Sequence, residues 1–370
     1  MKIGLLGCGV VGKEVRTILD KKEELELVRI LVKEESEIDD TRMTLSYEKI
    51  LQDEDINLII ECMGGLEPAY TYVKEALKHH KHVVTSNKKM LATHFMDLYE
   101  IACKNQVSLR YEACVAGGIP WIHEMNRVQR IDKIHSFYGI MNGTTNYILT
   151  KVAEGLSFEE ALSQAQQNGF AEQDPTDDID GYDARYKGVL TALTSFQTYI
   201  PIEEVPVYGI RSLSFEDQTY ALNHDGIIKL LVQGVQEENE ISLSVIPTLV
   251  SKDSILAKIT NETNAVFVTS DTLKESGYIG KGAGGEPTAH AVVQDVLSSP
   301  TIFQKDIQEG RNHLSRTASF YLRFSTIDHN CPFVKKVLSE TTILTKPITL
   351  KELYEYTKVN DIAFVMEVTQ

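Results

Sequence analysis

The sequence is poor in several features that mark particular classes of protein. Its five cysteines show no paired spacing, which is typical of buried thiols in a reducing compartment rather than of a disulfide framework or a zinc site. Its ten histidines form no H-x-x-x-H pattern, and no apolar run approaches the roughly 20 residues of a membrane span. The apolar stretch at 2–6 is too short for a signal peptide. We therefore expect a cytoplasmic protein without a membrane partner.

Positive charge is also scarce. The chain has 37 basic and 53 acidic residues, which gives a net charge of −16. This excess of negative charge argues against nucleic acid or an anionic surface as a partner. With 370 residues, 42% of them hydrophobic, the chain is long enough for two or three domains with cores of their own.

A glycine-rich turn follows the first apolar stretch. Residues 2–6 predict a strand and residues 13–19 a helix, with the pattern G-x-G-x-x-G between them. In such a turn the glycines permit a tight bend, the approach of a pyrophosphate and close packing of helix on strand. A structural turn without a ligand is the alternative. The candidate cofactor-binding residues here are Gly7, Gly9, Val10, Val11 and Gly12.

The second predicted strand, at 25–32, bears on the choice of cofactor. It ends at Lys33, where dinucleotide folds that bind NAD usually place an acidic residue. A cation suits the 2′-phosphate of NADP better, although Glu34 and Glu35 follow and Lys33 could be an ordinary surface lysine. The sequence favours NADP(H) slightly and leaves NAD(H) open.

Two loops follow the next predicted strands, at 56–61 and 82–85. Ligands bind at the carboxyl ends of the strands of an open parallel sheet, so both loops are candidates for holding the nicotinamide end of the cofactor. Lys88 would reach the same crevice unless it is an ordinary loop lysine. The candidate residues are Met63, Gly64, Gly65, Ser86 and Lys88.

Two further turns have two readings each. After a predicted strand at 107–112, backbone carbonyls and Glu112 could hold a monovalent cation, or Glu112 could cap the helix expected from near Pro120. A strand that ends at Met141 precedes another helix, whose first backbone N–H groups, from Gly143 on, would form a carboxylate site. Asn142 or Thr144 could equally be a plain N-cap of that helix.

The acidic segment 172–187 is the most informative stretch. It carries six carboxylates, at 172, 174, 177, 178, 180 and 183, and then Lys187. A helix predicted from Asp180 onward places Asp183 and Lys187 on one face at i, i+4. Because the rest of this helix is apolar, the pair should point inward, as in sites that transfer protons. A solvated loop with a surface ion pair is the alternative.

These motifs together resemble homoserine dehydrogenase. The resemblance spans roughly residues 1–315 and rests on several long motifs. It implies interconversion of L-aspartate 4-semialdehyde and L-homoserine with NAD(P), on the route to threonine, methionine and isoleucine. The matching segments are Gly7 to Gly12, Met63 to Pro68, Asn87-Lys88, Glu112 to Pro120, Asn142 to Tyr147, Glu172 to Lys187 and Gly282 to Thr288.

The resemblance also implies roles for individual residues. Lys187 would be the acid/base, Lys88 would lie near the nicotinamide and the substrate, and Asp183 would be a substrate-site carboxylate, which by the chemistry of the pair also orients Lys187. Glu172 and Asp178 would bind the substrate with the turn at Gly143 and Thr144. A sodium ion would be held at the backbone of Glu112, Val115, Gly117 and Ile119.

A second glycine turn, at 282–285, precedes a helix predicted at 288–297. We expect this turn, with Gly284, to close over the cofactor. The helix should pack inward through an apolar stripe at helical spacing. The stripe comprises Ala289, Val292, Val293, Val296 and Leu297.

The last 55 or so residues resemble a shortened ACT-type regulatory domain. We expect strands at 319–327, 342–344 and 362–368 and helices at 332–338 and 350–356. The usual Asp-x-Pro-Gly turn is replaced by the sequence of 328–333, and one strand is missing from the pattern, which puts threonine binding in doubt. A role in oligomerisation is at least as well supported, because unpaired edge strands invite pairing between subunits.

Other functions were weighed against the same residues. A semialdehyde dehydrogenase that works through a thiol needs a cysteine before its Thr-Thr-Asn run, and this chain has Gly143 there. A fused aspartate kinase is not expected, since no kinase module precedes residue 1. A nucleotide-binding sensor without activity would lack Lys187, Lys88 or Glu172, and all three are present.

The predicted fold is therefore α/β, in three parts. Residues 1–134 would form a Rossmann-type dinucleotide-binding domain, completed by the helix at 288–297. Residues 135–315 would form an α+β substrate and dimerisation domain, and residues 316–370 a small ACT-like α+β domain. We expect a homodimer or homotetramer that acts on a small amino acid.

Overall fold

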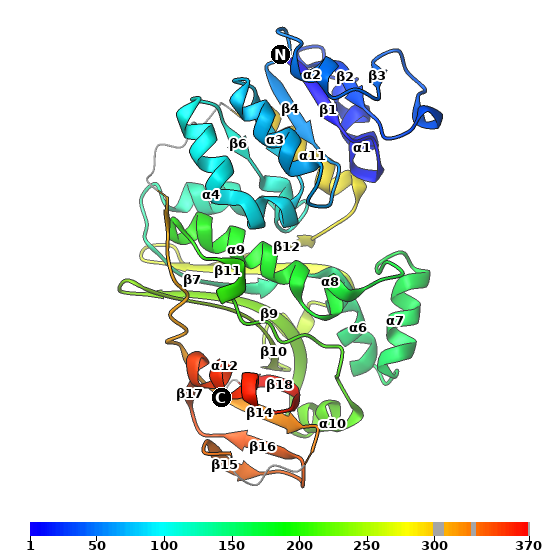
Figure 1. Cartoon of the computed structure of the whole chain (residues 1–370). Helices are drawn as coiled ribbons and strands as arrows, with labels where there is room; N and C mark the ends of the chain where they lie inside the picture. The colour runs from blue at the N-terminus through cyan, green and yellow to red at the C-terminus, as the bar shows by residue number, and fades with distance from the viewer. Residues whose placement is uncertain (299–306, 327–330, 369–370) are drawn as a thin grey trace. The chain divides into compact units, whose positions relative to one another are not determined.

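The structure, a computed structural model, describes residues 1–298, 307–326 and 331–368 (Figure 1). The chain forms two compact units, each built from segments distant in the sequence. The first comprises Met1–Arg127, Gln197–Tyr199 and Lys281–Glu309, and the second comprises Val128–Phe196, Ile200–Gly280 and Gly310–Gln370. The segment from 316 onward groups with the second unit, and its separation as a third domain stays a prediction.

The first unit contains a six-stranded sheet in the order β3-β2-β1-β4-β5-β6. Adjacent strands of this sheet pair in parallel. The first strand lies in the middle, between β2 and β4, so the strand order reverses there and creates a switch point of the kind where nucleotides bind. The strands are β1 (Lys2–Leu6), β2 (Glu26–Leu31), β3 (Met43–Thr44), β4 (Leu58–Glu61), β5 (His82–Thr85) and β6 (Leu109–Arg110).

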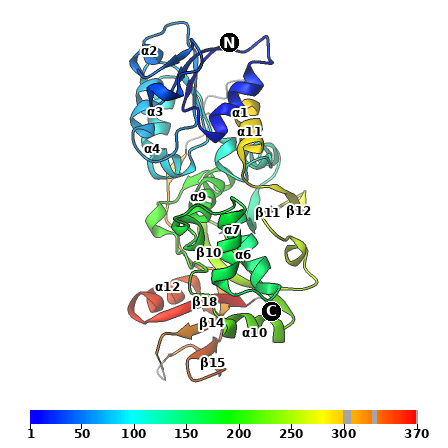
Figure 2. The same cartoon turned by 90° about the vertical axis from the view of Figure 1, so that its right-hand side faces the viewer.

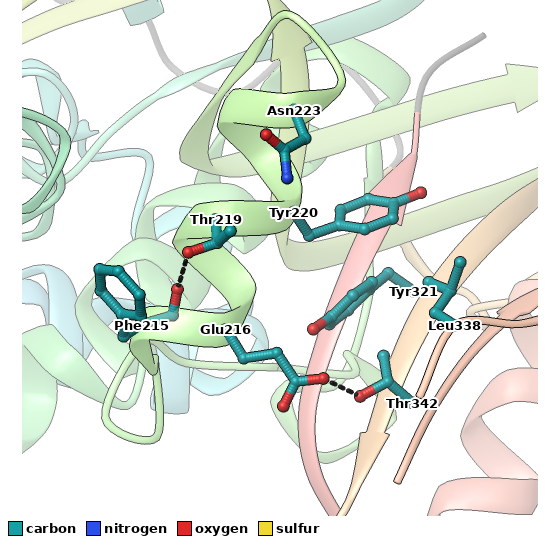
Figure 3. A pocket seen from close by; sticks show the side chains of 8 residues that line it. All are labelled: Phe215, Glu216, Thr219, Tyr220, Asn223, Tyr321, Leu338 and Thr342. Carbon is teal, nitrogen blue, oxygen red and sulfur yellow. Dashed lines mark hydrogen bonds between the residues drawn. The ribbon is translucent and has the colours of Figure 1, made fainter. Parts of the chain in front are cut away.

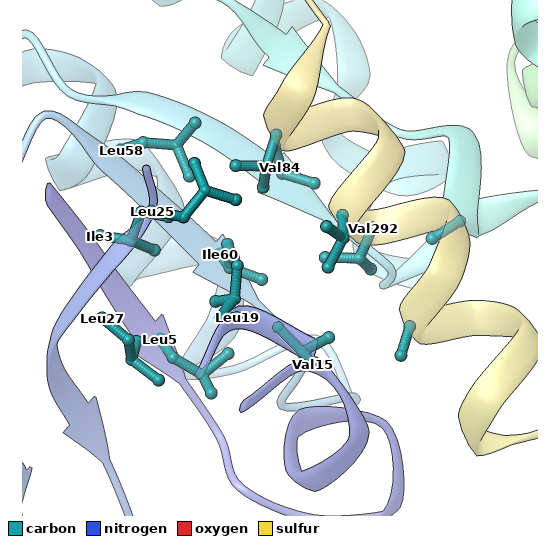
Figure 4. Close-up of a cluster of buried hydrophobic side chains, with 14 of the residues drawn as sticks. Ile3, Leu5, Val15, Leu19, Leu25, Leu27, Leu58, Ile60, Val84 and Val292 are labelled. Atoms are coloured by element: carbon teal, nitrogen blue, oxygen red, sulfur yellow. The ribbon is translucent and has the colours of Figure 1, made fainter. Parts of the chain in front are cut away.

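Helices cover this sheet, as expected for parallel strands that are buried on both faces. One apolar cluster contains residues of the strands, of α1 and of α11 (Figure 4). Two segments of the unit that lie far apart in the sequence therefore share one core. The predicted stripe on α11 is buried at Ala289, Val292, Val293 and Val296, but Leu297 at the helix end is exposed. The helices are α1 (Val10–Leu19), α2 (Glu48–Leu51), α3 (Ala69–Lys78), α4 (Lys88–Lys104), α5 (Trp121–Val128) and α11 (Gly285–Leu297).

The second unit is built on a large mixed sheet whose main path runs β12-β11-β7-β9-β10-β18-β14-β16-β15. The two long strands β9 and β10 form a hairpin at its centre. The Rossmann-type sheet of the first unit and this mixed sheet confirm the predicted α/β class. The strands are β7 (Ile134–Ile140), β9 (Gly226–Glu237), β10 (Glu240–Ser251), β11 (Thr263–Ser270), β12 (Lys274–Lys281), β14 (Thr317–Phe324), β15 (Val334–Val337), β16 (Thr342–Thr345), β17 (Ile348–Thr349) and β18 (Ile362–Val368).

The helix α9 packs against the β9–β10 hairpin of this sheet and is buried along almost its whole length. Its close approach depends on Gly188, where a Cβ atom would lie 2.7 Å from a methyl of Val232 on β9. The helices of the unit are α6 (Gly143–Ala153), α7 (Phe158–Gln167), α8 (Thr176–Ile179), α9 (Tyr182–Phe196), α10 (Phe215–Asn223) and α12 (Leu350–Val359). A short pairing of β8 (Thr198–Tyr199) with β13 (Gln308–Glu309) belongs to the first unit.

The C-terminal segment corrects one prediction. The helix expected at 332–338 is wrong, because Val334–Val337 form the strand β15, which pairs antiparallel with β16 at the end of the sheet. All four residues are exposed. Two β-branched valines flanking two lysines suit an exposed edge strand better than a helix, and edge lysines discourage further pairing. The replaced turn at 328–330 lies outside the described residues, and the ACT-like assignment stays a prediction.

Two helix starts and one strand end also differ from the sequence prediction. The helix α1 begins at Val10, directly after Gly9, instead of at residue 13. The helix predicted from Asp180 begins at Tyr182, as α9, after Gly181, whose φ is +84°, and the separate short helix α8 precedes it. The strand predicted at 107–112 ends at Arg110 because Glu112–Cys114 form a single 3-10 turn. Within the described residues, no helix has the length and apolar character of a membrane span.

Candidate functional site

The glycine turn of the first unit has the geometry expected of a phosphate-binding turn. Gly7 has a φ of +90°, and a Cβ atom on Gly12 would lie 2.1 Å from the carbonyl oxygen of Gly7. A Cβ atom on Gly9 would instead meet nothing within 4 Å. Gly7 and Gly12 are therefore required by the fold itself, whereas the space over Gly9 is open to a ligand.

The start of α1 is suited to an anion. Its N-cap is Gly9, which offers no side-chain hydrogen bond, and its first turn carries no acidic residue. Val10 in that turn is 77% exposed, which is unusual for a valine. Unsatisfied N–H groups at a helix N-terminus attract phosphate. Lys33, after the end of β2, is exposed, and its backbone N–H donates to Glu37 (2.8 Å).

The loops after β4 and β5 are tied together. Gly64 and Gly65 have φ values of +75° and +74°, so the first loop takes a path that favours glycine. The Asn87 side chain donates to the Gly65 carbonyl (2.7 Å) and accepts from the Met90 N–H (3.1 Å), which caps α4. Lys88, half-buried, is the first residue of α4, while Met63 and Ser86 lie at the starts of the two loops.

The turn after β6 shows the side chain of Glu112 in its capping role. Its carboxylate accepts from the backbone N–H groups of Ile122 (3.1 Å) and His123 (2.6 Å), at the start of α5. Burial raises the pKa of Glu112 to about 7. No group of three or more His, Cys, Asp or Glu side chains suited to a metal occurs in the part of the chain that the structure describes.

The backbone of the same turn is shaped for close packing. Ala116 and Gly117 have φ values of +57° and +54°. A Cβ atom on Gly117 would lie 2.6 Å from the carbonyl carbon of Gly282, and the Gly118 N–H donates to Lys281 (3.1 Å). The predicted cation-holding residues Val115, Gly117 and Ile119 thus lie in a turn that rests on the second glycine turn, near Gly284.

In the second unit, the predicted Asp183–Lys187 pair is formed inside the protein. Both residues are 6% exposed. The Lys187 Nζ donates to Asp183 Oδ2 (2.7 Å) and to the carbonyl oxygen of Met141 (2.7 Å), at the end of β7. The alternative of a surface ion pair is therefore wrong. An ammonium group removed from water is stable only when it is held by such partners.

Asn142 joins this pair to a second carboxylate. Its side-chain amide donates to Asp183 Oδ2 (2.8 Å) and to Asp178 Oδ1 (2.6 Å). Its carbonyl oxygen accepts from the Thr145 N–H (2.8 Å), so the same side chain caps α6. We call Met141, Asn142, Asp178, Asp183 and Lys187 the lysine cluster. The sequence suggested Asn142 only as a cap, because its carboxylate partners are 36 and 41 residues away.

The start of α6 lies beside this cluster and has no acidic residue in its first turn. Thr144 donates its hydroxyl to the Phe170 carbonyl (2.5 Å), and a Cβ atom on Gly143 would lie 2.7 Å from the Glu262 carbonyl oxygen. Glu172 is different: its side chain is exposed and makes no hydrogen bond or ion pair within the described residues. The structure thus joins Asp178 and Asp183 through Asn142, which directly precedes Gly143 and Thr144, whereas no hydrogen bond joins the Glu172 side chain to them within the described residues.

A cavity of about 360 Å³ lies elsewhere in the second unit. Its walls come from α10 and from the C-terminal strands, and Figure 3 shows Glu216 and Thr342 in contact across it, at 2.7 Å. None of the predicted site residues lines it. The lining residues are Phe215, Glu216, Thr219, Tyr220, Asn223, Tyr321, Leu338 and Thr342.

Comparison with known proteins places these features in one family. Residues 7–112 match the family model described as "Homoserine dehydrogenase, NAD binding domain", and residues 120–297 match the model described as "Homoserine dehydrogenase". A homoserine dehydrogenase of Synechocystis sp. is 39% identical over 315 residues, which cover 80% of this chain and 73% of the relative.

Solved structures agree with the sequence matches. A homoserine dehydrogenase from Thiobacillus denitrificans has a TM-score of 0.88 at 28% identity, with 100% of this chain and 98% of the other covered. A hyperthermophilic archaeal homoserine dehydrogenase in complex with NADPH has a TM-score of 0.69 at 27% identity, with 80% and 96% covered.

Proposed function

The chain belongs to the homoserine dehydrogenase family, and we propose from this premise that its lysine cluster carries the acid–base step of the family's reaction. Homoserine dehydrogenases are NAD(P)-dependent oxidoreductases. Their reaction interconverts L-aspartate 4-semialdehyde and L-homoserine, which requires the movement of one hydride and one proton. The observation that carries the proposal is the buried Lys187 held between Asp183 and Met141.

Lys187 is the proton donor when the aldehyde is reduced. An ammonium group carries N–H donors that can give a proton to the substrate oxygen. Because negative charge develops on that oxygen, a fixed cation beside it stabilises the transition state. Asp183 orients the ammonium group, and Asn142 fixes Asp183 in turn. In the oxidative direction Lys187 acts as the neutral amine and receives the proton of the alcohol.

The amino-acid part of the substrate needs partners of both signs. We assign its ammonium group to Asp178 and Glu172, and its carboxylate to the N-terminus of α6 at Gly143 and Thr144. The absence of acidic residues from the first turn of α6 supports the second assignment. The exposed position of Glu172 leaves its carboxylate accessible to a ligand.

The nicotinamide cofactor supplies or accepts the hydride when it is bound. The fit of this chain to a dinucleotide rests on the open space over Gly9 and the uncapped start of α1. We assign the pyrophosphate to the turn from Gly7 to Gly12, including the N–H groups of Val10 and Val11. The nicotinamide end is assigned to Met63, Gly64, Gly65, Ser86 and Gly284, and Lys88 is assigned as a second cation near the reacting oxygen.

We also propose NADP(H) over NAD(H) as the preferred cofactor. The exposed Lys33 at the end of β2 supports this, since a lysine there can pair with a 2′-phosphate. The complex of the archaeal relative with NADPH is consistent with it. The comparison of kcat/KM for NADP⁺ and NAD⁺, in the enzyme and in a Lys33→Ala variant, tests the assignment.

A monovalent cation at the turn after β6 is a further part of the proposal. The support is the positive φ of Ala116 and Gly117, which turns successive peptide groups and allows several carbonyls to face one point. Sodium would be held by the backbone of Glu112, Val115, Gly117 and Ile119. Activity measured in NaCl against tetramethylammonium chloride at equal ionic strength tests this assignment.

Finally, we propose a homodimer or homotetramer located in the cytoplasm. The mixed sheet ends at β12 and β15, and the edge at β12 can pair between subunits, whereas the lysines of β15 discourage pairing there. The five cysteines are free thiols, as in a reducing compartment. Light scattering coupled to gel filtration measures the oligomeric state, and a strictly monomeric mass would contradict this part of the proposal.

The test of the reaction is direct. The purified protein is mixed with L-homoserine and either NAD⁺ or NADP⁺ at alkaline pH, and cofactor reduction is followed by absorbance in the near ultraviolet. Homoserine-dependent reduction is the expected result. Binding of the cofactor without any reduction would contradict the proposed function and would favour a nucleotide-binding sensor.

A further inference from the structure

The last residue of β4, Glu61, is a buried carboxylate without a role in the reaction described above. Its side chain is fully shielded from solvent, at 0% exposure, in the middle of the parallel sheet of the first unit. Burial raises the pKa of this group above its ordinary value. A carboxylate in such a place destabilises the fold unless hydrogen bonds compensate for the lost water.

Both oxygens of Glu61 accept such bonds. The Met63 N–H donates to Oε1 (2.7 Å), and the Thr85 hydroxyl donates to Oε2 (2.5 Å). Met63 lies in the loop after β4, and Thr85 is the last residue of β5, so one side chain holds the ends of two neighbouring strands. Hydrogen bonds accepted by both oxygens match an ionised carboxylate.

The bonds continue from Thr85 to the start of α4. The Asn87 N–H donates to the Thr85 hydroxyl oxygen (3.0 Å), and the Asn87 side chain donates to the Gly65 carbonyl (2.7 Å). Lys88 follows directly as the first residue of the helix. Glu61, Thr85 and Asn87 therefore connect the glycine loop to the backbone that carries Lys88. We call these three residues the loop clamp.

We propose that Glu61 is a positioning residue that sets the nicotinamide-binding loop and Lys88 for hydride transfer. This inference rests on the proposed function. Glu61 touches neither cofactor nor substrate and acts through Met63, Thr85 and Asn87. Loss of the clamp should therefore weaken binding of the nicotinamide end of the cofactor. It should not weaken binding of the adenosine diphosphate end, which the turn from Gly7 to Gly12 binds.

Replacement of Glu61 by glutamine tests this division. Because Met63 and Thr85 donate to different oxygens of Glu61, the amide places its NH₂ group against one of these two donors, and the negative charge is also lost. In E61Q we expect the Kd of the oxidised cofactor to rise about 10-fold and kcat to fall about 10-fold, as for the loss of one buried hydrogen bond. The Kd of ADP-ribose, or of its 2′-phosphate if the enzyme uses NADP, should change less than about twofold. Glu26→Gln, at an exposed carboxylate on β2, is the control.

A purely structural role would give a different pattern. If E61Q weakens cofactor and ADP-ribose equally, or weakens neither, the inference is overturned. Thr85 provides a second test that does not depend on E61Q folding, because Thr85→Ser keeps the hydroxyl and Thr85→Val removes it. We expect T85V to reproduce the selective loss of cofactor affinity and T85S to restore it, and equal affinities in the two variants would contradict the clamp.

The outcome is independent of the reaction itself. Cofactor and ADP-ribose binding are measured without substrate, by fluorescence or calorimetric titration. If the wild-type protein does not oxidise L-homoserine, the proposed function is overturned, but the cofactor and ADP-ribose binding measurements still test the role of Glu61. A wild-type enzyme that turns over normally while E61Q shows no selective loss would overturn only the role of Glu61.

Discussion

The second unit buries two lysines, and their surroundings differ. Lys187 on α9 is 6% exposed and donates to the carboxylate of Asp183. Lys229 on β9 is 1% exposed and donates to the amide oxygen of Asn146 (2.8 Å) and the carbonyl of Ile259 (2.5 Å), which are both neutral. Burial lowers the pKa of Lys229 to about 8.

Burial does not distinguish Lys187, the proposed catalytic lysine, from Lys229, which is buried even more deeply. Both lysines are linked to the same helix end, Lys187 through Asp183 and Asn142, and Lys229 through Asn146. Around Lys187 there are two carboxylates and the open start of a helix, which together match a zwitterionic substrate. Among the described residues, the hydrogen-bond acceptors of Lys229 are the Asn146 side-chain amide and the Ile259 backbone carbonyl. We infer that Lys187 serves the reaction and Lys229 holds α6 in place.

The largest expected effect comes from removal of Lys187. In Lys187→Ala, kcat should fall about 10³-fold, because general acid–base catalysis contributes about 10²- to 10⁴-fold. The Kd of the cofactor, measured by fluorescence titration, should stay within about twofold, since the glycine turn is unchanged. Lys151→Ala, at an ion-paired lysine on α6, is the control. Substantial turnover by K187A would remove the distinction between the two lysines.

Asp183→Asn should produce the next largest loss. The amide cannot provide the negative charge that orients the ammonium group of Lys187, so we expect kcat to fall about 10²-fold, the lower end of acid–base contributions. The KM for L-homoserine should change less. Steady-state kinetics at saturating cofactor measures both values. An unchanged kcat in D183N would mean that Met141 alone is enough to hold the lysine.

The two asparagines of α6 sharpen the comparison further. Serine keeps a capping oxygen at position 142 but removes the amide donor to Asp178 and Asp183. We expect Asn142→Ser to lower kcat/KM about 30-fold, because two hydrogen bonds to carboxylates are lost at about 1 kcal/mol each, with little change in melting temperature. Asn146→Ser should instead lower the melting temperature and leave kcat/KM nearly unchanged. Thermal unfolding and steady-state kinetics of both variants test this difference. Equal losses of kcat/KM and of melting temperature in the two variants would contradict the assignment of Asn142 to the reaction and of Asn146 to stability.

Replacement of Lys229 is expected to change activity the least. It should instead change the free energy of unfolding and its dependence on pH. Between about pH 8 and the ordinary lysine value of 10.5, the unfolded chain binds more protons than the folded protein. The free energy of unfolding should therefore rise with pH, by up to about 1.4 kcal/mol per pH unit. Lys229→Met removes this contribution. Urea unfolding at pH 8 and pH 10 should show the wild type gaining about 2 kcal/mol relative to K229M.

Much of the fold could be read from the sequence because apolar periodicity and glycines mark it. The strands β1 and β5 have the predicted ends, and the G-x-G-x-x-G turn lies where it was predicted. The β15 strand could not be read in this way, because its Val-Lys-Lys-Val sequence has no clear period and its conformation comes from pairing with β16.

Spacing in the sequence predicts contacts in the site only between residues that are close along the chain, and the resemblance supplied the more distant Asp178, Gly143 and Thr144. Asp183 and Lys187 are four residues apart, so helical spacing brings them together. Glu61 and Lys229 lie within apolar strands, where a single charged residue gives no signal until its partners are known. Those partners are 24 residues away at Thr85 and 83 residues away at Asn146, and only the folded chain brings them into contact.

The most direct test of the central claim is a side-by-side measurement of homoserine oxidation by K187A and K229M. Both variants remove a buried ammonium group from the second unit, and both are assayed at saturating L-homoserine and cofactor. We predict that K187A loses about 10³-fold in kcat while K229M stays within about threefold of the wild type. Loss of turnover in K229M with activity retained in K187A would contradict the account and assign the proton transfer to Lys229.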